Sequence, residues 1–257
     1  MVNPSSSFGH VSDQRRNYLA IMGIESWERR MNGTMQSRKE IISSSMPATS
    51  AAIPDVDVNS PDEVASMGWE ALEQAVQDCT ACPLHRVRTR DIFGIGNRAT
   101  QWLIVSDVPG VDQNQLCKFF TDREEQLLYQ MLHGIGLRHE EVYLTSIIKS
   151  CLPANRTLAP AEAAACRPYL ERQIELIHPR IILAVGAVAA QNLLRTTTPI
   201  GLLRGRVYRH GTIRVPMIVT YHPSYLLRDC HEKAKAWDDL RLAWRVFHRI
   251  PPDGQDF

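Results

Sequence analysis

The feature that most constrains this chain is a regular alternation of short apolar runs with amphipathic stretches between residues 61 and 250. The apolar runs have the length and the branched side chains of buried strands, and the stretches between them carry apolar residues at helical spacing. Strands are expected at 102–106, 142–148, 181–185 and 217–221, and helices at 61–77, 124–137, 159–177, 187–194 and 233–248. This order predicts a three-layer α/β/α sandwich with a mostly parallel central sheet.

The residues outside this domain have a different composition. Residues 1–14 are predicted to be disordered, and residues 31–60 are rich in Ser, Thr, Pro and Ala, which is typical of a flexible linker. Between them, residues 15–30 predict a short helix, and residues 251–257 form a tail. The helix is too short to hold a core, so it needs a surface on a partner or on its own domain. Its apolar side chains are Leu19, Met22, Ile24 and Trp27.

Composition argues against two classes of protein. No apolar run approaches the ~18 residues that span a bilayer, and the N-terminus has no apolar signal-peptide core. We therefore expect a cytoplasmic protein. The formal net charge is +1, so any contact with DNA must come from a local basic patch.

Four of the six cysteines have a spacing that suits metal chemistry. Cys79 and Cys82 form a C-x-x-C pair, Cys151 follows a predicted strand, and Cys166 lies in a predicted helix. Four thiolates brought together by a fold hold a [4Fe–4S] cluster or a zinc ion. The alternative is an incidental pair with two small buried cysteines, and spacing alone favours neither.

Polar residues follow two predicted strands at the edge of the sheet where ligands bind. Asp107 lies in a turn with Pro109 and Gly110, where it would orient a water or stabilise a cation, unless it is only a turn residue. His222 would donate a hydrogen bond to a leaving group that gains negative charge, unless it only hydrogen-bonds within its loop. We expect these two loops to converge with the loop at 146–155.

The segment around His222 is locally basic. Five arginines of this segment would contact the phosphates of a DNA backbone, or they would form a solvated face of a hairpin. They are at 204, 206, 209, 214 and 228. Leu226 would wedge between stacked bases if it is exposed, whereas a Leu-Leu pair is more often core. The residues expected to contact DNA are Pro223, Ser224, Leu226 and Arg228.

Several segments resemble the iron–sulfur (family 4) uracil-DNA glycosylases in order and spacing. They lie at 79–85, 93–97, 108–110, 155–157, 166–170, 184–190 and 222–228. The resemblance implies a glycosylase fold with a pocket that takes a base flipped out of DNA. It also implies that Asp107 and His222 are catalytic, that Phe120, Ser146 and His222 form the uracil pocket, and that Cys79, Cys82, Cys151 and Cys166 hold a structural [4Fe–4S] cluster.

Some positions depart from the family pattern. Asp107 stands where the family has Glu, and Ser146 stands where the family has the Asn that reads uracil. Ser150 stands at the third cysteine, with Cys151 one residue later, and an acidic stretch at 122–125 replaces small residues. These departures predict a degenerate glycosylase.

Residues 15–30 resemble the N-terminal peptide of the psi subunit of the bacterial DNA polymerase III clamp loader. That resemblance implies binding to the clamp-loader collar through Leu19, Met22, Ile24 and Trp27, and binding of a chi-like subunit to the α/β domain. Together the two resemblances predict a psi-like replication subunit on a degenerate glycosylase scaffold. The alternative is an active family 4 uracil-DNA glycosylase of base-excision repair.

Overall fold

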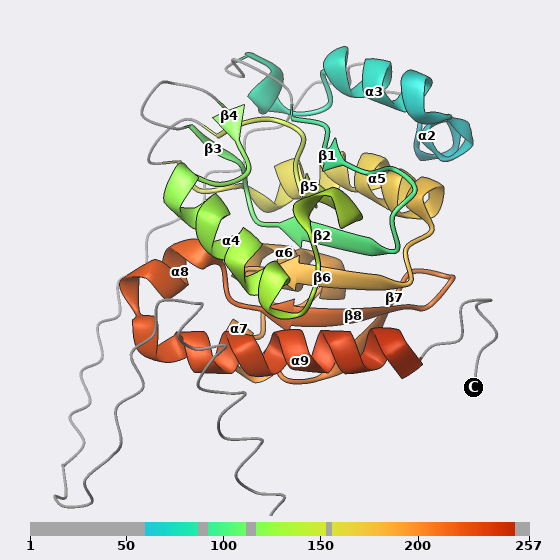
Figure 1. Cartoon of the computed structure of the whole chain (residues 1–257). Coiled ribbons are helices and arrows are strands. Elements are labelled where there is room, and N and C mark those ends of the chain that lie inside the picture. Colours follow the sequence, from blue (N-terminus) through green and yellow to red (C-terminus); the bar gives the residue numbers. More distant parts are fainter. Residues whose placement is uncertain (1–59, 87–91, 112–116, 153–155, 250–257) are drawn as a thin grey trace, which may run out of the picture.

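A computed structural model describes residues 60–86, 92–111, 117–152 and 156–249 (Figure 1). Its centre is a six-stranded sheet with the strand order β1-β5-β2-β6-β8-β7. The four middle strands are parallel, and the two edge strands are antiparallel to their neighbours. This confirms the predicted sheet. The strands are β1 (Ile95–Gly96), β5 (Val142–Ser146), β2 (Trp102–Ser106), β6 (Ile181–Val185), β8 (Val215–Thr220) and β7 (Val207–His210).

Helices cover both faces of the sheet. On one face α4 (Asp122–Gly134) and α9 (Lys233–Arg249) pack against a core that contains Ile104, Leu128 and Leu240. On the other face α5 (Pro160–Ile177) and α6 (Ala187–Leu194) pack against a core that contains Leu103 and Leu170. Every residue of the four parallel strands is buried, as helices on both faces require. The predicted three-layer α/β/α sandwich is therefore confirmed.

The helix predicted over residues 61–77 is two helices, α2 (Pro61–Ser66) and α3 (Trp69–Gln77). The first begins at a capping box formed by Ser60 and Glu63. The second begins after Gly68, its N-cap residue, and Met67 between them has extended backbone. Both helices pack on α5, so they extend one outer layer.

Short elements that apolar periodicity does not predict connect the strands and helices of the sandwich (Figure 1). The hairpin of β3 and β4 forms a separate two-stranded sheet. These short elements are β3 (Gly110–Val111), β4 (Cys117–Lys118), η1 (Pro83–Arg86), η2 (His139–Glu141), α7 (Ile200–Leu203), α8 (Pro223–Arg228) and η3 (Cys230–Glu232).

The parts of the chain outside the described residues include the predicted partner-binding helix at 15–30, most of the predicted linker, and the predicted tail at 251–257. Within the described part, no helix has both the length and the apolar character that crossing a membrane requires.

The path of the chain through the sheet creates a topological switch point. From β2 the chain passes through α4 to β5 on one side, and then through α5 to β6 on the other side of β2. The carboxyl ends of β2 and β6 therefore flank a crevice of the kind in which open α/β sheets bind ligands. Asp107 directly follows β2, and Gly186 directly follows β6.

Candidate active site

A pocket of about 640 Å³ opens at the switch point. Its walls come from the turn after β2, the first turn of α6, the short helix α7 and the segment that runs from the end of β8 into α8. The lining residues are Asp107, Val108, Ala187, Val188, Ile200, Gly201, Tyr221, His222, Ser224, Tyr225 and Arg228. The pocket thus brings together two predicted catalytic residues, Asp107 and His222.

Asp107 is held by the first turn of α6. Its Oδ1 accepts a hydrogen bond from the backbone N–H of Ala189 at 2.6 Å. Burial raises the pKa of the carboxyl group to about 7, and backbone N–H groups of α6 at Ala189, Val188 and Ala187 limit the rise. Gly186 has φ +111°, and a Cβ there would overlap the carboxylate of Asp107. A glycine is therefore needed for the close approach of this turn to the carboxylate.

His222 is oriented by Ser224. Its Nδ1 accepts a hydrogen bond from the backbone N–H of Ser224 at 3.2 Å and lies 2.7 Å from the hydroxyl Oγ of the same residue. A backbone N–H only donates, so Nδ1 is the acceptor and the neutral ring carries its proton on Nε2. Burial lowers the pKa of His222 to about 4. At neutral pH the ring is an uncharged donor through Nε2–H.

Phe120 lies against this histidine. The two ring centroids are 5.1 Å apart and the rings are inclined by 34°. Phe120 is buried in the core beneath α4 and α9. The structure therefore packs Phe120 against His222, but Phe120 is 4% exposed and is not among the residues that line the pocket.

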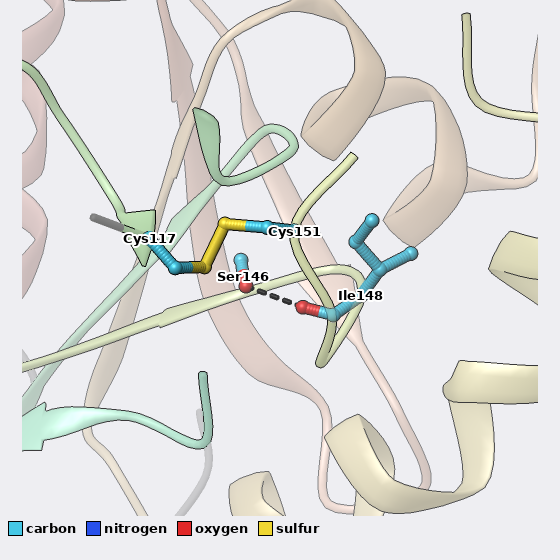
Figure 2. The surroundings of a disulfide bond; sticks show 4 residues. All are labelled: Cys117, Ser146, Ile148 and Cys151. Carbon is cyan, nitrogen blue, oxygen red and sulfur yellow. Dashed lines mark hydrogen bonds between the residues drawn. A yellow bond between two sulfur atoms is a disulfide. The ribbon is translucent and has the colours of Figure 1, made fainter. Parts of the chain in front are cut away.

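Ser146, the third residue predicted for the uracil pocket, is not placed to bind a base. It is fully buried at the end of β5, and its hydroxyl donates a 2.5 Å hydrogen bond to the carbonyl of Ile148 (Figure 2). It is not among the residues that line the pocket. The hydroxyl proton is used within its own loop, so Ser146 does not present a donor to a base in the pocket.

One of the four predicted metal ligands has a different partner in the structure. Cys151 forms a disulfide with Cys117, with the Cα atoms 5.8 Å apart (Figure 2), whereas Cys79, Cys82 and Cys166 lie outside it. The pKa of the Cys166 thiol is raised to about 11, first by burial and then by the nearby Cys82 and Cys79.

The fit of a metal group to this set is poor. In the described parts of the chain, no group of three or more His, Cys, Asp or Glu side chains is placed to hold a metal ion. With Cys151 committed to the disulfide, the predicted set of four thiolates does not fit a [4Fe–4S] cluster, which needs all four sulfurs around one centre.

The four residues predicted to contact DNA differ in how exposed their side chains are. Arg228 is exposed on the rim of the pocket, and Ser224 is half-buried in it. Leu226 is fully buried in the core, and Pro223 is buried as the first residue of α8, so the structure does not expose these two predicted contacts. The exposed neighbour is Leu227, at 36%, because α8 turns consecutive side chains to different faces.

Sequence reasoning missed most of the apolar wall of the pocket. Ala187 and Val188 belong to α6, and their signal was present as a strand followed by Gly186 and a helix, the pattern of a turn that brings backbone N–H groups to a ligand. Tyr221 is the last residue of the predicted strand at 217–221, whereas β8 ends at Thr220. Ile200 and Gly201 lie in a four-residue helix that leaves no periodic signal.

Comparison with known proteins identifies a family and several relatives to which this chain is similar. The model of the family described as the uracil DNA glycosylase superfamily matches residues 93–241. The type-4 uracil-DNA glycosylase of Thermotoga maritima is 37% identical over 169 residues, which cover 62% of this chain and 83% of the relative. The same-named protein of Pyrobaculum aerophilum is 33% identical over 182 residues, 68% of this chain and 93% of the relative. That of Archaeoglobus fulgidus is 36% identical over 168 residues, 62% and 84%.

These relatives correct the functional prediction. Proteins that are 30–37% identical to this chain carry the name type-4 uracil-DNA glycosylase, and this overturns the prediction of a psi-like clamp-loader subunit on a degenerate scaffold. The peptide on which the clamp-loader and chi-like partners depended lies outside the described residues. Since the matched segment is more than half of the 257 residues, the chain belongs to the uracil DNA glycosylase superfamily.

Proposed function

We propose that this chain is an active type-4 uracil-DNA glycosylase, which hydrolyses the N-glycosidic bond between uracil and deoxyribose in DNA. The observation that carries the proposal is a neutral histidine, His222, whose Nδ1 is occupied by Ser224 and which shares the switch-point pocket with Asp107. The type-4 assignment is supported by the names of the relatives that are 30–37% identical.

His222 would act on the leaving base. When the glycosidic bond breaks, its electron pair moves onto uracil, and negative charge gathers on a carbonyl oxygen of the base. A fixed Nε2–H donor stabilises that charge and retains its proton, which suits a ring with a pKa of about 4. A cationic imidazolium is not required for this role.

Asp107 would act on the sugar. The deoxyribose gains positive charge at C1′ as uracil leaves, and an ionised carboxylate stabilises that charge or orients the water that attacks C1′. The attacking water gives its oxygen to C1′ and passes a proton to the carboxylate of Asp107, and the uracil anion takes up a proton from solvent, so the products are an abasic site and free uracil. Because the pKa of Asp107 is about 7, the ionised form required here is well populated from neutral pH upward.

Three further residues fit a flipped base and its DNA. The ring of Phe120, packed beside His222, would stack on uracil. Arg228 on the pocket rim would contact a phosphate, and the exposed Leu227 would fill the space that the flipped base leaves in the stack. The catalytic unit is the domain that we predict over residues 61–250.

The deciding experiment is an excision assay on single- and double-stranded DNA with one uracil. Wild-type protein and the His139→Ala variant, in which an exposed histidine on η2 is lost, should release uracil, and His222→Ala should not. Absence of release by the wild type on both substrates, or equal release by His222→Ala, would contradict the proposal.

A further inference from the structure

The short helix α7 presents the most exposed large apolar side chain of the described residues. Leu202 is 64% exposed, whereas Leu203 beside it is 6% exposed and lies in a core. Ile200, the first residue of the helix, packs against the cores on both faces of the sheet. A single exposed leucine is common in soluble proteins, so the position of α7 in the fold decides what Leu202 can do.

α7 lies at the edge of the sheet where the pocket opens. It precedes β7, and Val207, the first residue of β7, pairs with Ile218 close to the carboxyl end of β8. Two residues of α7, Ile200 and Gly201, line the pocket. Because consecutive Cα atoms are ~3.8 Å apart, the backbone of Leu202 is one residue away from the pocket wall. Leu202 therefore lies next to the pocket and faces solvent.

The conformation of α7 is fixed by an ion pair behind it. Arg204, the C-cap residue of α7, donates from Nε and Nη2 to the two carboxylate oxygens of Asp239 on α9, both at 2.9 Å. The backbone N–H of Gly205 donates to the same carboxylate at 3.0 Å, and Asp239 is fully buried. A bidentate pair fixes orientation as well as distance. The direction of Leu202 is therefore set by the fold.

The two short segments around the pocket each combine an exposed leucine with an exposed arginine. In α8 these are Leu227 and Arg228. In the other segment Leu202 is followed by Arg206, just after the helix. A guanidinium binds phosphate oxygens through charge-assisted hydrogen bonds, and an apolar side chain packs against a base that has lost its stacking partner. This combination around a pocket fits a DNA strand.

We propose that α7 is a second DNA-contact element of this domain, in addition to α8. Leu202 packs against the nucleotide next to the flipped one, and Arg206 binds a phosphate of the same strand. That strand is the one that carries uracil, because Leu202 directly follows Gly201 in the wall of the pocket. The position of the contact beside a flipped nucleotide rests on the proposed glycosylase function, whereas binding of DNA by α7 is measured without any reaction.

The first test is binding of the full chain to a fluorescein-labelled DNA with one 2′-fluorodeoxyuridine, followed by fluorescence anisotropy. The fluorine withdraws electrons from C1′ and prevents excision during the titration. Leu202→Ala should raise Kd about fivefold on the single strand and on the duplex alike, because burial of an apolar side chain against the uracil strand is lost. Leu227→Ala, which is expected to act only on a base stack, should affect the duplex alone.

The matched control is Ile213→Ala. Ile213 is 45% exposed in the turn between β7 and β8, at the opposite edge of the sheet, so this variant should bind both DNAs as the wild type does. Leu202→Ala should melt within about 2 °C of the wild type, because an exposed side chain contributes little to stability. If Leu202→Ala binds both DNAs as tightly as the wild type, α7 is not a DNA contact.

The second test is the salt dependence of the same Kd values. Arg206→Gln should lower the slope of log Kd against log salt concentration by about 1, the effect of one lost phosphate contact. Arg209→Gln removes an exposed arginine that lies farther along β7, away from the pocket edge, and should keep the slope of the wild type. An unchanged slope in Arg206→Gln would overturn the phosphate contact.

Single-turnover uracil excision separates the α7 contact from the proposed function. Leu202→Ala should need about fivefold more protein to reach half of its maximal rate, and that maximal rate should stay within about twofold of the wild type, because Leu202 touches no reacting atom. Weaker binding by Leu202→Ala without any excision by the wild type would sustain the α7 contact and defeat the proposed function. Equal excision by Leu202→Ala and the wild type at every protein concentration would sustain the function and overturn the α7 contact.

Discussion

The ends of β5 and β8 lie at the same edge of the sheet, and both strands are buried at every residue, yet the polar groups that follow them are used differently. After β8, Ser224 holds one nitrogen of His222 and leaves the other to donate. After β5, the hydroxyl of Ser146 and the ammonium of Lys149 are bonded within the loop itself. We therefore expect the chemistry of this pocket to depend on the β8 end and the β5 end to act as a structural anchor.

The largest expected effect is at His222. His222→Ala removes the donor to the leaving base, so single-turnover excision should fall by about 10²–10³-fold.

The His222 ring also affects how the stability of the fold changes with pH. Because its folded pKa of about 4 lies below the ordinary 6.5, the unfolded chain binds the proton more readily, and the fold loses stability as pH falls from 6.5 towards 4. Urea unfolding should show that this acid-side loss is smaller in the variant; an unchanged loss would show that the histidine is not buried as a neutral ring.

Asp107 is expected to set the pH dependence of excision. The rate of the wild type should rise with pH to about 7 and then level off, as the carboxyl group ionises. Asp107→Asn keeps an oxygen that accepts from Ala189, so the fold should persist, and excision should fall about 100-fold with no limb near pH 7. If the excision rate of the variant still rises with pH near 7, the titrating group is not Asp107.

The raised pKa of Asp107 also predicts how the stability of the fold changes with pH, and this trend is opposite to the one expected from His222. The folded pKa of about 7 lies above the ordinary 3.8, so the contribution of Asp107 is fully present below pH 3.8 and is lost as pH rises through 7. Asp107→Asn should remove this loss, which urea unfolding at pH 5 and pH 8 measures. Equal pH dependence in the two proteins would contradict the raised pKa.

The adjacent leucines of α8 test which side chain meets DNA. Leu226→Ala should lower the free energy of unfolding by about 2–5 kcal/mol, because Leu226 is fully buried. Leu227→Ala should change stability by less than about 0.5 kcal/mol. It should slow excision from duplex DNA about fivefold while sparing single strands, which need no wedge. Equal losses on both substrates would mean that Leu227 acts on the pocket and not on the base stack.

Much of the fold was predictable from the sequence, because buried parallel strands and amphipathic helices leave strong periodic signals. The helix at 187–194 and the strands at 102–106 and 181–185 agree with the structure residue for residue. The edge strands β1 and β7 were missed, since they are short and partly exposed. The break at Gly68 was missed because apolar spacing continues across it.

The site was predictable only in part, because side-chain direction and hydrogen-bond partners are not encoded in spacing. The acidic stretch at 122–125 was interpreted as damage to a pocket, yet it forms the first turn of α4, where Glu124 accepts a hydrogen bond from the backbone of Thr121 and acidic residues are favourable. Likewise, no spacing rule distinguishes a metal ligand at Cys151 from a disulfide to a cysteine 34 residues earlier.

The last pair of predictions makes one chemical change, serine to alanine, at the ends of β8 and β5, and the smallest expected effect on excision is at the β5 end. Ser224→Ala removes the hydroxyl beside Nδ1 of His222 but leaves the backbone N–H that fixes the tautomer. Excision should therefore fall about tenfold, the effect of one hydrogen bond to a group that changes charge distribution in the reaction.

Ser146→Ala removes a buried hydroxyl that donates to the carbonyl of Ile148. It should lower the free energy of unfolding by about 1–3 kcal/mol, because the carbonyl loses its partner. Excision at a temperature where both proteins are folded should change by less than about threefold, since less than 1 kcal/mol of transition-state stabilisation would be involved. If Ser146→Ala slows excision as much as Ser224→Ala does, the hydroxyl must turn towards the base during the reaction, and the end of β5 belongs to the pocket chemistry after all.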